Sequence, residues 1–182
     1  IWLSIMTSNS TGSISIEAYQ HTLTEQIKNA ADTETSPTVL GVAVGEERYL
    51  IPMNEVSEVI QIPKLARVPL TQPWFLGLAN VRGNLYGVTD LAVYLGSHQM
   101  PFTLKSRILL VSAGNKIYGG FIVHSMLGIR NLSEFVPVQS AKKKQVKVMS
   151  NRQYKDSEDR LWRELSLLQL MSEEKFLQIA RE

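Results

Sequence analysis

The chain has 182 residues, of which 44% are hydrophobic and 20% are charged, and its 19 basic side chains nearly balance 17 acidic ones. This composition is typical of a globular protein with a self-sufficient core, and the absence of cysteine excludes disulfide scaffolds, zinc ribbons, iron–sulfur clusters and thiol nucleophiles. The net charge of +2 gives little indication of the class of partner, and no apolar run approaches the roughly 18 residues of a membrane helix, so we expect no direct membrane insertion.

The first 36 residues differ in character from the rest. Residues 7–15 are mostly Ser, Thr, Asn and Gly, a composition that cannot bury enough apolar surface to fold. Apolar residues then recur at helical spacing: Ile16, Tyr19, Leu23, Ile27 and Ala30. We therefore expect residues 1–36 to form a flexible tail and one amphipathic helix, and residues 37–182 to form the main domain.

After Pro37, short β-rich runs alternate with turns that contain glycine. Four strands are expected here, of which the first two form a hairpin: residues 39–44, 49–53, 56–62 and 85–89. The third strand carries one oddly placed acid, Glu58. Asp90 is placed to cap a short helix that Gly96 ends.

The chain also repeats itself. A shift of 69 positions superposes five pairs of residues: Leu40 and Leu109, Val42 and Val111, Gly45 and Gly114, Tyr49 and Tyr118, Ile60 and Ile129. Each copy ends with a strand, a capping residue and a brief helix, and Ser166 with Gln169 forms a capping-box pattern in the second copy. The repeat predicts two similar small β-barrels packed together. After the second copy, we expect residues 172–181 to form a terminal helix.

Residues that could carry chemistry are sparse. His21, His98 and His124 have no second ligand at metal-like spacing, and the chain has no phosphate-binding loop and no G-x-S-x-G elbow. The paired acids lie in turns or at helix starts. We expect no catalytic residue, no metal and no cofactor, so the chain is not expected to be an enzyme, although a small-molecule site between the barrels stays open as a rival.

A basic run, Lys142–Lys144 with Lys147, leaves a second alternative. Small barrels do bind nucleic acid, and a lysine run can contact phosphates. The run has no interleaved aromatic residues on which bases could stack, so we favour a solvated loop and no nucleic-acid partner.

The segment from Pro63 to Gly83 combines turn-forming residues with large apolar side chains. Gly83 after Arg82 predicts a tight turn with positive φ, which would hold the guanidinium out at a loop tip. An exposed arginine in an ordinary hairpin is the simpler interpretation. An arginine held in an internal ion pair away from the surface would contradict any docking role.

A set of motifs in this region resembles the CheW-like family of adaptor proteins. The matching stretches are Val56-Ser57-Glu58-Val59, Arg67-Val68-Pro69, Phe75-Leu76-Gly77, Asn80-Val81-Arg82-Gly83 and Asp90-Leu91. Their spacing fits the family pattern without insertion. The resemblance implies a mainly β fold of two packed, interleaved, SH3-like five-stranded β-barrel subdomains, with the N-terminal helix and short C-terminal helices as additions.

The resemblance also implies a function. CheW-like proteins are non-catalytic adaptors that couple methyl-accepting chemoreceptors to the regulatory domain of a CheA-type histidine kinase, in the cytoplasm at membrane-associated receptor arrays. The N-terminal extension is similar to that of the PilI-like members of twitching-motility and phototaxis pathways, whose output is type IV pilus movement. The positions that map to receptor or kinase contact are Val56, Glu58, Gly77, Asn80, Arg82 and Gly83. An exposed Val56 beside Glu58 would give a small apolar patch with a charge.

Overall fold

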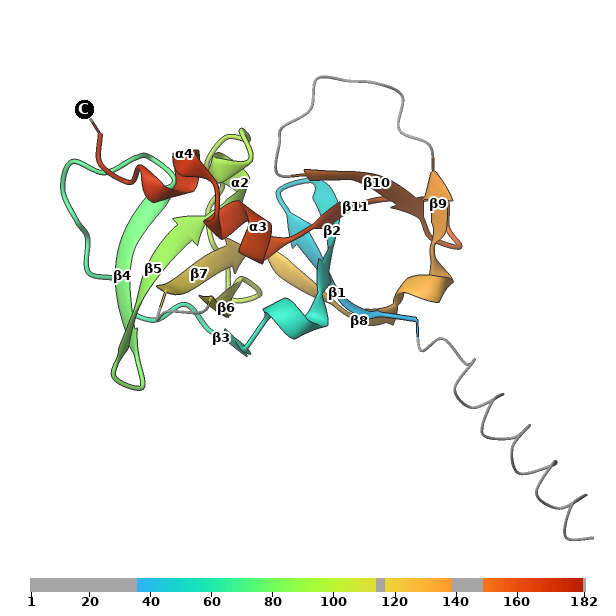
Figure 1. Ribbon diagram of the computed structural model, residues 1–182, viewed down its shortest axis with the longest axis horizontal. Helices are drawn as coiled ribbons and strands as arrows, with labels where there is room; N and C mark the ends of the chain where they lie inside the picture. Colours follow the sequence, from blue (N-terminus) through green and yellow to red (C-terminus); the bar gives the residue numbers. More distant parts are fainter. Residues whose placement is uncertain (1–35, 114–116, 139–148, 182) are drawn as a thin grey trace, which may run out of the picture. The chain divides into compact units, whose positions relative to one another are not determined.

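The computed structural model describes residues 36–113, 117–138 and 149–181, which Figure 1 draws in colour. Residues 1–35 of the tail and helix that were expected over residues 1–36 lie outside the described residues, as does the lysine run at Lys142–Lys144. Ser36–Glu182 forms one structural unit, separate from Ile1–Thr35.

Each half of this unit supplies a similar series of elements. The first half contains β1 (Thr38–Val44), β2 (Glu47–Pro52), the 3₁₀ turn η1 (Met53–Glu55), β3 (Glu58–Ile60), β4 (Phe75–Val81), β5 (Asn84–Asp90) and α2 (Leu91–Tyr94). The second half contains β6 (Arg107–Ala113), β7 (Ile117–Val123), β8 (Ser125–Asn131), η2 (Leu132–Glu134), β9 (Val136–Val138), β10 (Met149–Lys155), β11 (Leu161–Leu165), α3 (Leu167–Met171) and α4 (Glu174–Leu177). Both halves therefore begin with a hairpin and end with a strand and a helix, but the 3₁₀ turn follows two strands in the first half and three in the second, which also has a further helix, α4.

The two halves exchange their first hairpins. One sheet has the order β8-β1-β2-β11-β10-β9 and the other has the order β3-β6-β7-β5-β4, so each sheet contains strands from both halves (Figure 1). The expected mainly β fold with two sheets is confirmed. One sheet has six strands instead of five, because β9 pairs with β10 where the other sheet has only an isolated bridge between Ala66 and Leu78.

The core has three parts. The largest cluster lies between the sheets and includes Leu40 and Val42 of β1 together with Leu109 and Val111 of β6, the residues that the 69-residue shift superposes. Of two smaller clusters, one consists of side chains of the five-stranded sheet and the other consists mainly of side chains of the six-stranded sheet. The repeated apolar positions thus join the two sheets, which explains why both halves keep them.

The two capped helices differ from the sequence pattern in one respect. Asp90 caps α2 as expected, because its side chain accepts hydrogen bonds from the backbone N–H groups of Ala92 and Val93. Burial raises the pKa of Asp90. At α3, the Ser166 side chain accepts from the Gln169 N–H, but the acid that completes the cap is Glu55 of η1, 112 positions before Leu167, whose N–H it accepts at 2.6 Å.

The terminal helix expected over residues 172–181 is present but shorter than expected. Helical structure there is limited to α4, which ends at Leu177, and Ala180 instead forms a β-bridge with Thr71. The Arg181 N–H donates to the carbonyl oxygen of Leu70 at 2.9 Å. The chain end is extended because the loop before β4 offers it backbone partners.

Candidate docking surface

The β4–β5 hairpin ends in a two-residue turn formed by Arg82 and Gly83. Their φ angles are 52° and 84°, and Val81 pairs with Asn84 across the turn. Positive φ at both central residues is the geometry that matches the twist of the flanking strands. The Asn80 side chain accepts the Gly83 N–H at 3.0 Å and fixes the turn. The predicted tight turn is confirmed.

Arg82 projects from this turn into solvent. Its side chain is 78% exposed, and its Nη2 lies 2.9 Å from Oε1 of Glu58, whose side chain is 32% exposed. An exposed pair of this kind contributes little to stability, roughly 0–1 kcal/mol. The guanidinium keeps most of its donors free for a partner, so the ion pair orients Arg82 without removing it from the surface.

Glu58 is positioned by the start of β3. The Ser57 N–H and hydroxyl both donate to the carbonyl oxygen of Leu110, each at 2.8 Å, which attaches the edge strand to β6. Glu58 is the residue that faces Leu110 in the β3–β6 register. The oddly placed acid of the sequence is therefore the partner of Arg82.

Val56 does not form the exposed patch that we expected. Its side chain is half-buried against the core between the sheets, and its N–H donates to the carbonyl oxygen of Met53, the first residue of η1. The exposed valine of this segment is Val59, at 36%. The expectation was wrong about exposure because η1 turns the chain inward just before β3.

Gly77 has a structural explanation of its own. Its φ is +131°, and a Cβ at this position would collide with the backbone carbonyl of Ala66, which pairs with Leu78. The strand also has a bulge between Phe75 and Gly77. Gly77 lets the loop approach β4, and its side of the strand is buried.

The structure thus brings four of the six predicted residues together, Glu58, Asn80, Arg82 and Gly83, and it adds one that the sequence reasoning missed. Leu85 faces Asn80 across the hairpin and is 59% exposed. Leu85 alternates with Tyr86, which is buried, and this alternation is the sequence signal that could have identified an outward-facing leucine.

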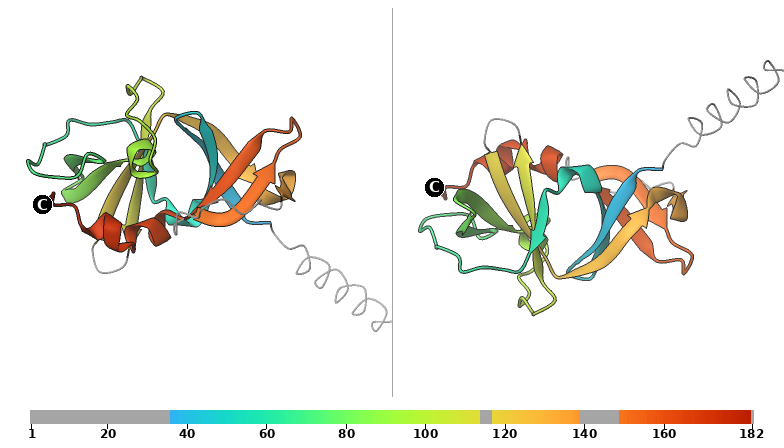
Figure 2. Two further views of the ribbon diagram at one scale, coloured as in Figure 1. Left: turned by 90° about the horizontal axis from the view of Figure 1, so that it is seen from above. Right: turned by 90° about the horizontal axis from the view of Figure 1, so that it is seen from below.

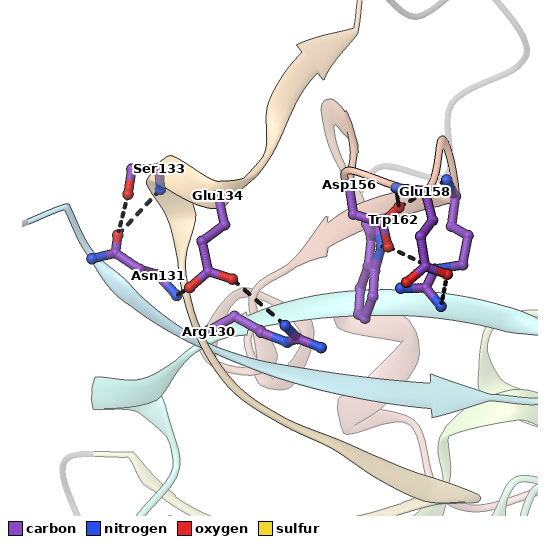
Figure 3. A network of polar contacts seen from close by, with 8 residues as sticks. Arg130, Asn131, Ser133, Glu134, Asp156, Glu158 and Trp162 are labelled. Carbon is purple, nitrogen blue, oxygen red and sulfur yellow. Dashed lines mark hydrogen bonds and ion pairs between the residues drawn. The ribbon is translucent and has the colours of Figure 1, made fainter.

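A second polar cluster surrounds the β10–β11 turn (Figure 3). Asp156 accepts hydrogen bonds from the Trp162 indole N–H at 2.9 Å and from Arg160 Nε at 2.7 Å, and Arg160 also pairs with Glu158. A groove of about 300 Å³ lies between this turn and η2. The acids that line it have partners within the protein, so the groove does not resemble an active site.

The histidines show no metal site within the described ranges. His124 Nδ1 accepts the Gly45 N–H at 3.0 Å, and His98 lies exposed in a loop. No three His, Asp or Glu side chains of the described residues lie close enough together to hold a metal ion. His21 lies outside this part of the chain. Within the same ranges, no helix has the length and hydropathy required to cross a bilayer.

Comparison with known proteins identifies the architecture. A CheW-like domain matches residues 38–175. The chain belongs to the CheW-like family. A crystal structure of the scaffolding protein TtCheW from Thermoanaerobacter tengcongensis superposes with a TM-score of 0.62 and 20% identity, covering 72% of this chain and 85% of that one. This similarity shows that the fold is that of CheW.

Relatives with curated names match about half of this CheW-like chain. Protein PilI of Pseudomonas aeruginosa is 33% identical over 92 residues, which is 50% of this chain and 51% of PilI. The chemotaxis protein CheW of Helicobacter pylori is 31% identical over 91 residues, which is 50% of this chain and 55% of that protein. The chain thus spans about half the length of these relatives.

Proposed function

We propose that this CheW-like protein is a non-catalytic adaptor that couples a methyl-accepting chemoreceptor to the regulatory domain of a CheA-type histidine kinase. Membership of the family supports this function, and the similarity to PilI supports a pathway that controls type IV pilus movement. The observation that carries the proposal is the rigid turn that holds the Arg82 side chain 78% exposed.

The docking surface consists of Arg82, Glu58 and Leu85, with Asn80 and Gly83 as the residues that shape the turn. Arginine is enriched among interface hot spots, and an apolar neighbour excludes water from its hydrogen bonds. Val56 and Gly77 act indirectly, because Val56 packs under β3 and Gly77 admits the loop beside β4.

Coupling requires one chain to contact two partners. The two sheets share one core, so a partner bound to one sheet is held in a fixed relation to a partner bound to the other. Allosteric coupling between sites typically amounts to about 1–3 kcal/mol, which differential contacts at two such surfaces supply without any chemical step. The protein acts in the cytoplasm, at receptor arrays.

Titration calorimetry with the purified kinase regulatory domain and a receptor signalling fragment tests this function. We expect the wild-type protein to bind both, and Arg82→Glu to weaken one of the interactions by about 2 kcal/mol, roughly 30-fold. Arg152→Glu is the matched control, because Arg152 is 72% exposed and pairs with Glu164 on the other hairpin. Wild-type affinity of Arg82→Glu for both partners would reject the docking role.

A further inference from the structure

The loop between β3 and β4 is held firmly although it lacks regular structure. Thr71 forms a β-bridge with Ala180, the Gln72 N–H donates to Ile179 at 2.8 Å, and Leu70 accepts the Arg181 N–H. Nearer the start of the loop, Ala66 pairs with Leu78 of β4. These bonds fix the loop at both ends, so residues 67–70 have a defined position.

Leu70 in this loop combines two unfavourable features. It is 82% exposed, and its φ is +56°, in the left-handed region that a leucine rarely adopts. Val68 beside it is 38% exposed. Strained conformations persist where surrounding structure holds them, and they concentrate at functional sites. The hydrogen bonds to the C-terminal segment are what hold Leu70 in place.

The surroundings of Leu70 are basic. The loop and the C-terminal segment paired with it contribute three exposed cations, Lys64, Arg67 and Arg181. None of them forms an ion pair with a residue in the described ranges. Residues 61–73 and 178–181 contain no acidic side chain at all. Glu182 directly follows Arg181 in the sequence, so the excess positive charge around the exposed Leu70 side chain comes from Lys64 and Arg67.

This patch is distinct from the Arg82 turn. The loop and the C-terminal segment lie at the end of the five-stranded sheet that is remote from the six-stranded sheet (Figures 1 and 2). Arg82 follows the last residue of β4, whereas Leu70 lies before its first residue. A protein bound at the Arg82 turn leaves the opposite end of the strand available.

We propose that Leu70, with Val68, forms a second docking point that inserts into an apolar pocket edged by carboxylates on a protein partner. The inference rests on the proposed function and assigns one of its two partners to this surface. A rigidly presented side chain loses little conformational entropy on binding, which favours a shaped pocket. A lipid surface is disfavoured, because even a myristoyl chain gives only marginal membrane binding, and Leu70 buries much less.

Leu70→Asn is the decisive variant, since asparagine tolerates the left-handed conformation and removes the apolar side chain. We expect its melting temperature to equal or exceed that of the wild type, and its affinity for either the receptor fragment or the kinase regulatory domain to fall at least fivefold. Leu104→Asn is the control. Leu104 is 96% exposed in another loop and has no positive φ, so its replacement leaves both affinities unchanged.

Three results would overturn the inference. Unchanged affinity of Leu70→Asn for both partners would show that the surface is not used. A clear fall in melting temperature would show that Leu70 supports the loop. Wild-type retention on vesicles of anionic phospholipid, lost in Leu70→Asn, would assign the patch to a membrane. A wild-type protein that binds neither partner would instead reject the proposed function itself.

Discussion

The β4–β5 and β10–β11 hairpins occupy equivalent places in the two sheets. β5 pairs in parallel with β7, where Gly87 lies beside Gly119, and β11 pairs in parallel with β2, where Glu164 lies beside Leu50. Leu50 and Gly119 are related by the 69-residue shift that superposes the two halves of the chain. The two hairpins are thus the same structural unit used twice.

Their tips have opposite character. Glu164 of β11 and Gly87 of β5 are equivalent positions. Two residues before them lie Trp162, which is 2% exposed, and Leu85, which is 59% exposed. The turn that follows β10 converges on the carboxylate of Asp156, whereas the Arg82 turn has a single exposed ion pair. The β10–β11 hairpin is closed, because its side chains stabilise its own sheet. The β4–β5 hairpin is open, because its side chains are available to a partner.

The largest expected effect is on the closed hairpin. Trp162→Ala removes a buried indole whose ring centroid lies 5.3 Å from that of Phe135. We expect this change to lower the free energy of unfolding by about 3–5 kcal/mol. Leu85→Ala at the equivalent place should change it by less than about 0.5 kcal/mol. Chemical denaturation measures both. Similar losses for the two variants would erase the distinction between the hairpins.

The next effect concerns the backbone of the open hairpin. Gly83→Val places a β-branched residue at a φ of +84°, and we expect a loss of about 2 kcal/mol in the free energy of unfolding. No atom lies within 4 Å of a Cβ built there, so the cost comes from backbone conformation alone. Gly83→Asn is the control and should lose less than half as much. Equal losses would mean that the turn is not set by positive φ.

A charge exchange separates orientation from recognition at the open hairpin. Arg82→Glu combined with Glu58→Arg restores a pair of opposite charges, so the free energy of unfolding should stay within about 0.5 kcal/mol of the wild type. Partner affinity should stay about 30-fold low, because the exposed charge is reversed. Calorimetry against the kinase regulatory domain and the receptor fragment measures this. Wild-type affinity of the double variant would mean that binding requires an ion pair between these two positions and does not depend on which of them carries the positive charge.

Local patterns in the sequence predict much of this molecule. Alternation indicated the strands, the 69-residue shift indicated the duplicated architecture, and Gly83 after Arg82 indicated the turn. Each of these depends on neighbours along the chain or on a repeated apolar face. For the same reason, the sequence identified Asp90 as the cap of α2.

The features that the sequence did not predict depend on contacts between distant segments. Glu55 caps α3 from the other half of the chain, and Ala180 leaves the helical conformation to pair with Thr71. Val56 turns inward because η1 precedes β3. No pattern within a few residues records such contacts, so the exposure of Val56 and the end of α4 came out wrong.

The smallest expected effect is the contribution of Asp156, in the closed hairpin, to the pH dependence of stability. Burial by itself raises the pKa of Asp156, but the hydrogen bonds that it receives outweigh burial and hold this pKa below its usual range. The unfolded chain therefore binds the proton more tightly, and the stability that Asp156 contributes is present above a pH of about 4 and lost as the pH falls below it.

Unfolding free energies measured from pH 7 to pH 3 show whether this carboxylate contributes. Asp156→Asn should be less stable than the wild type at pH 7, and the difference should shrink as the pH falls, because only the wild type loses the ionised form. Asp159→Asn removes an 81% exposed carboxylate from the same turn and should keep the wild-type pH dependence. A constant difference between Asp156→Asn and the wild type would mean that the closed hairpin depends on packing around Trp162 and not on the ionised carboxylate.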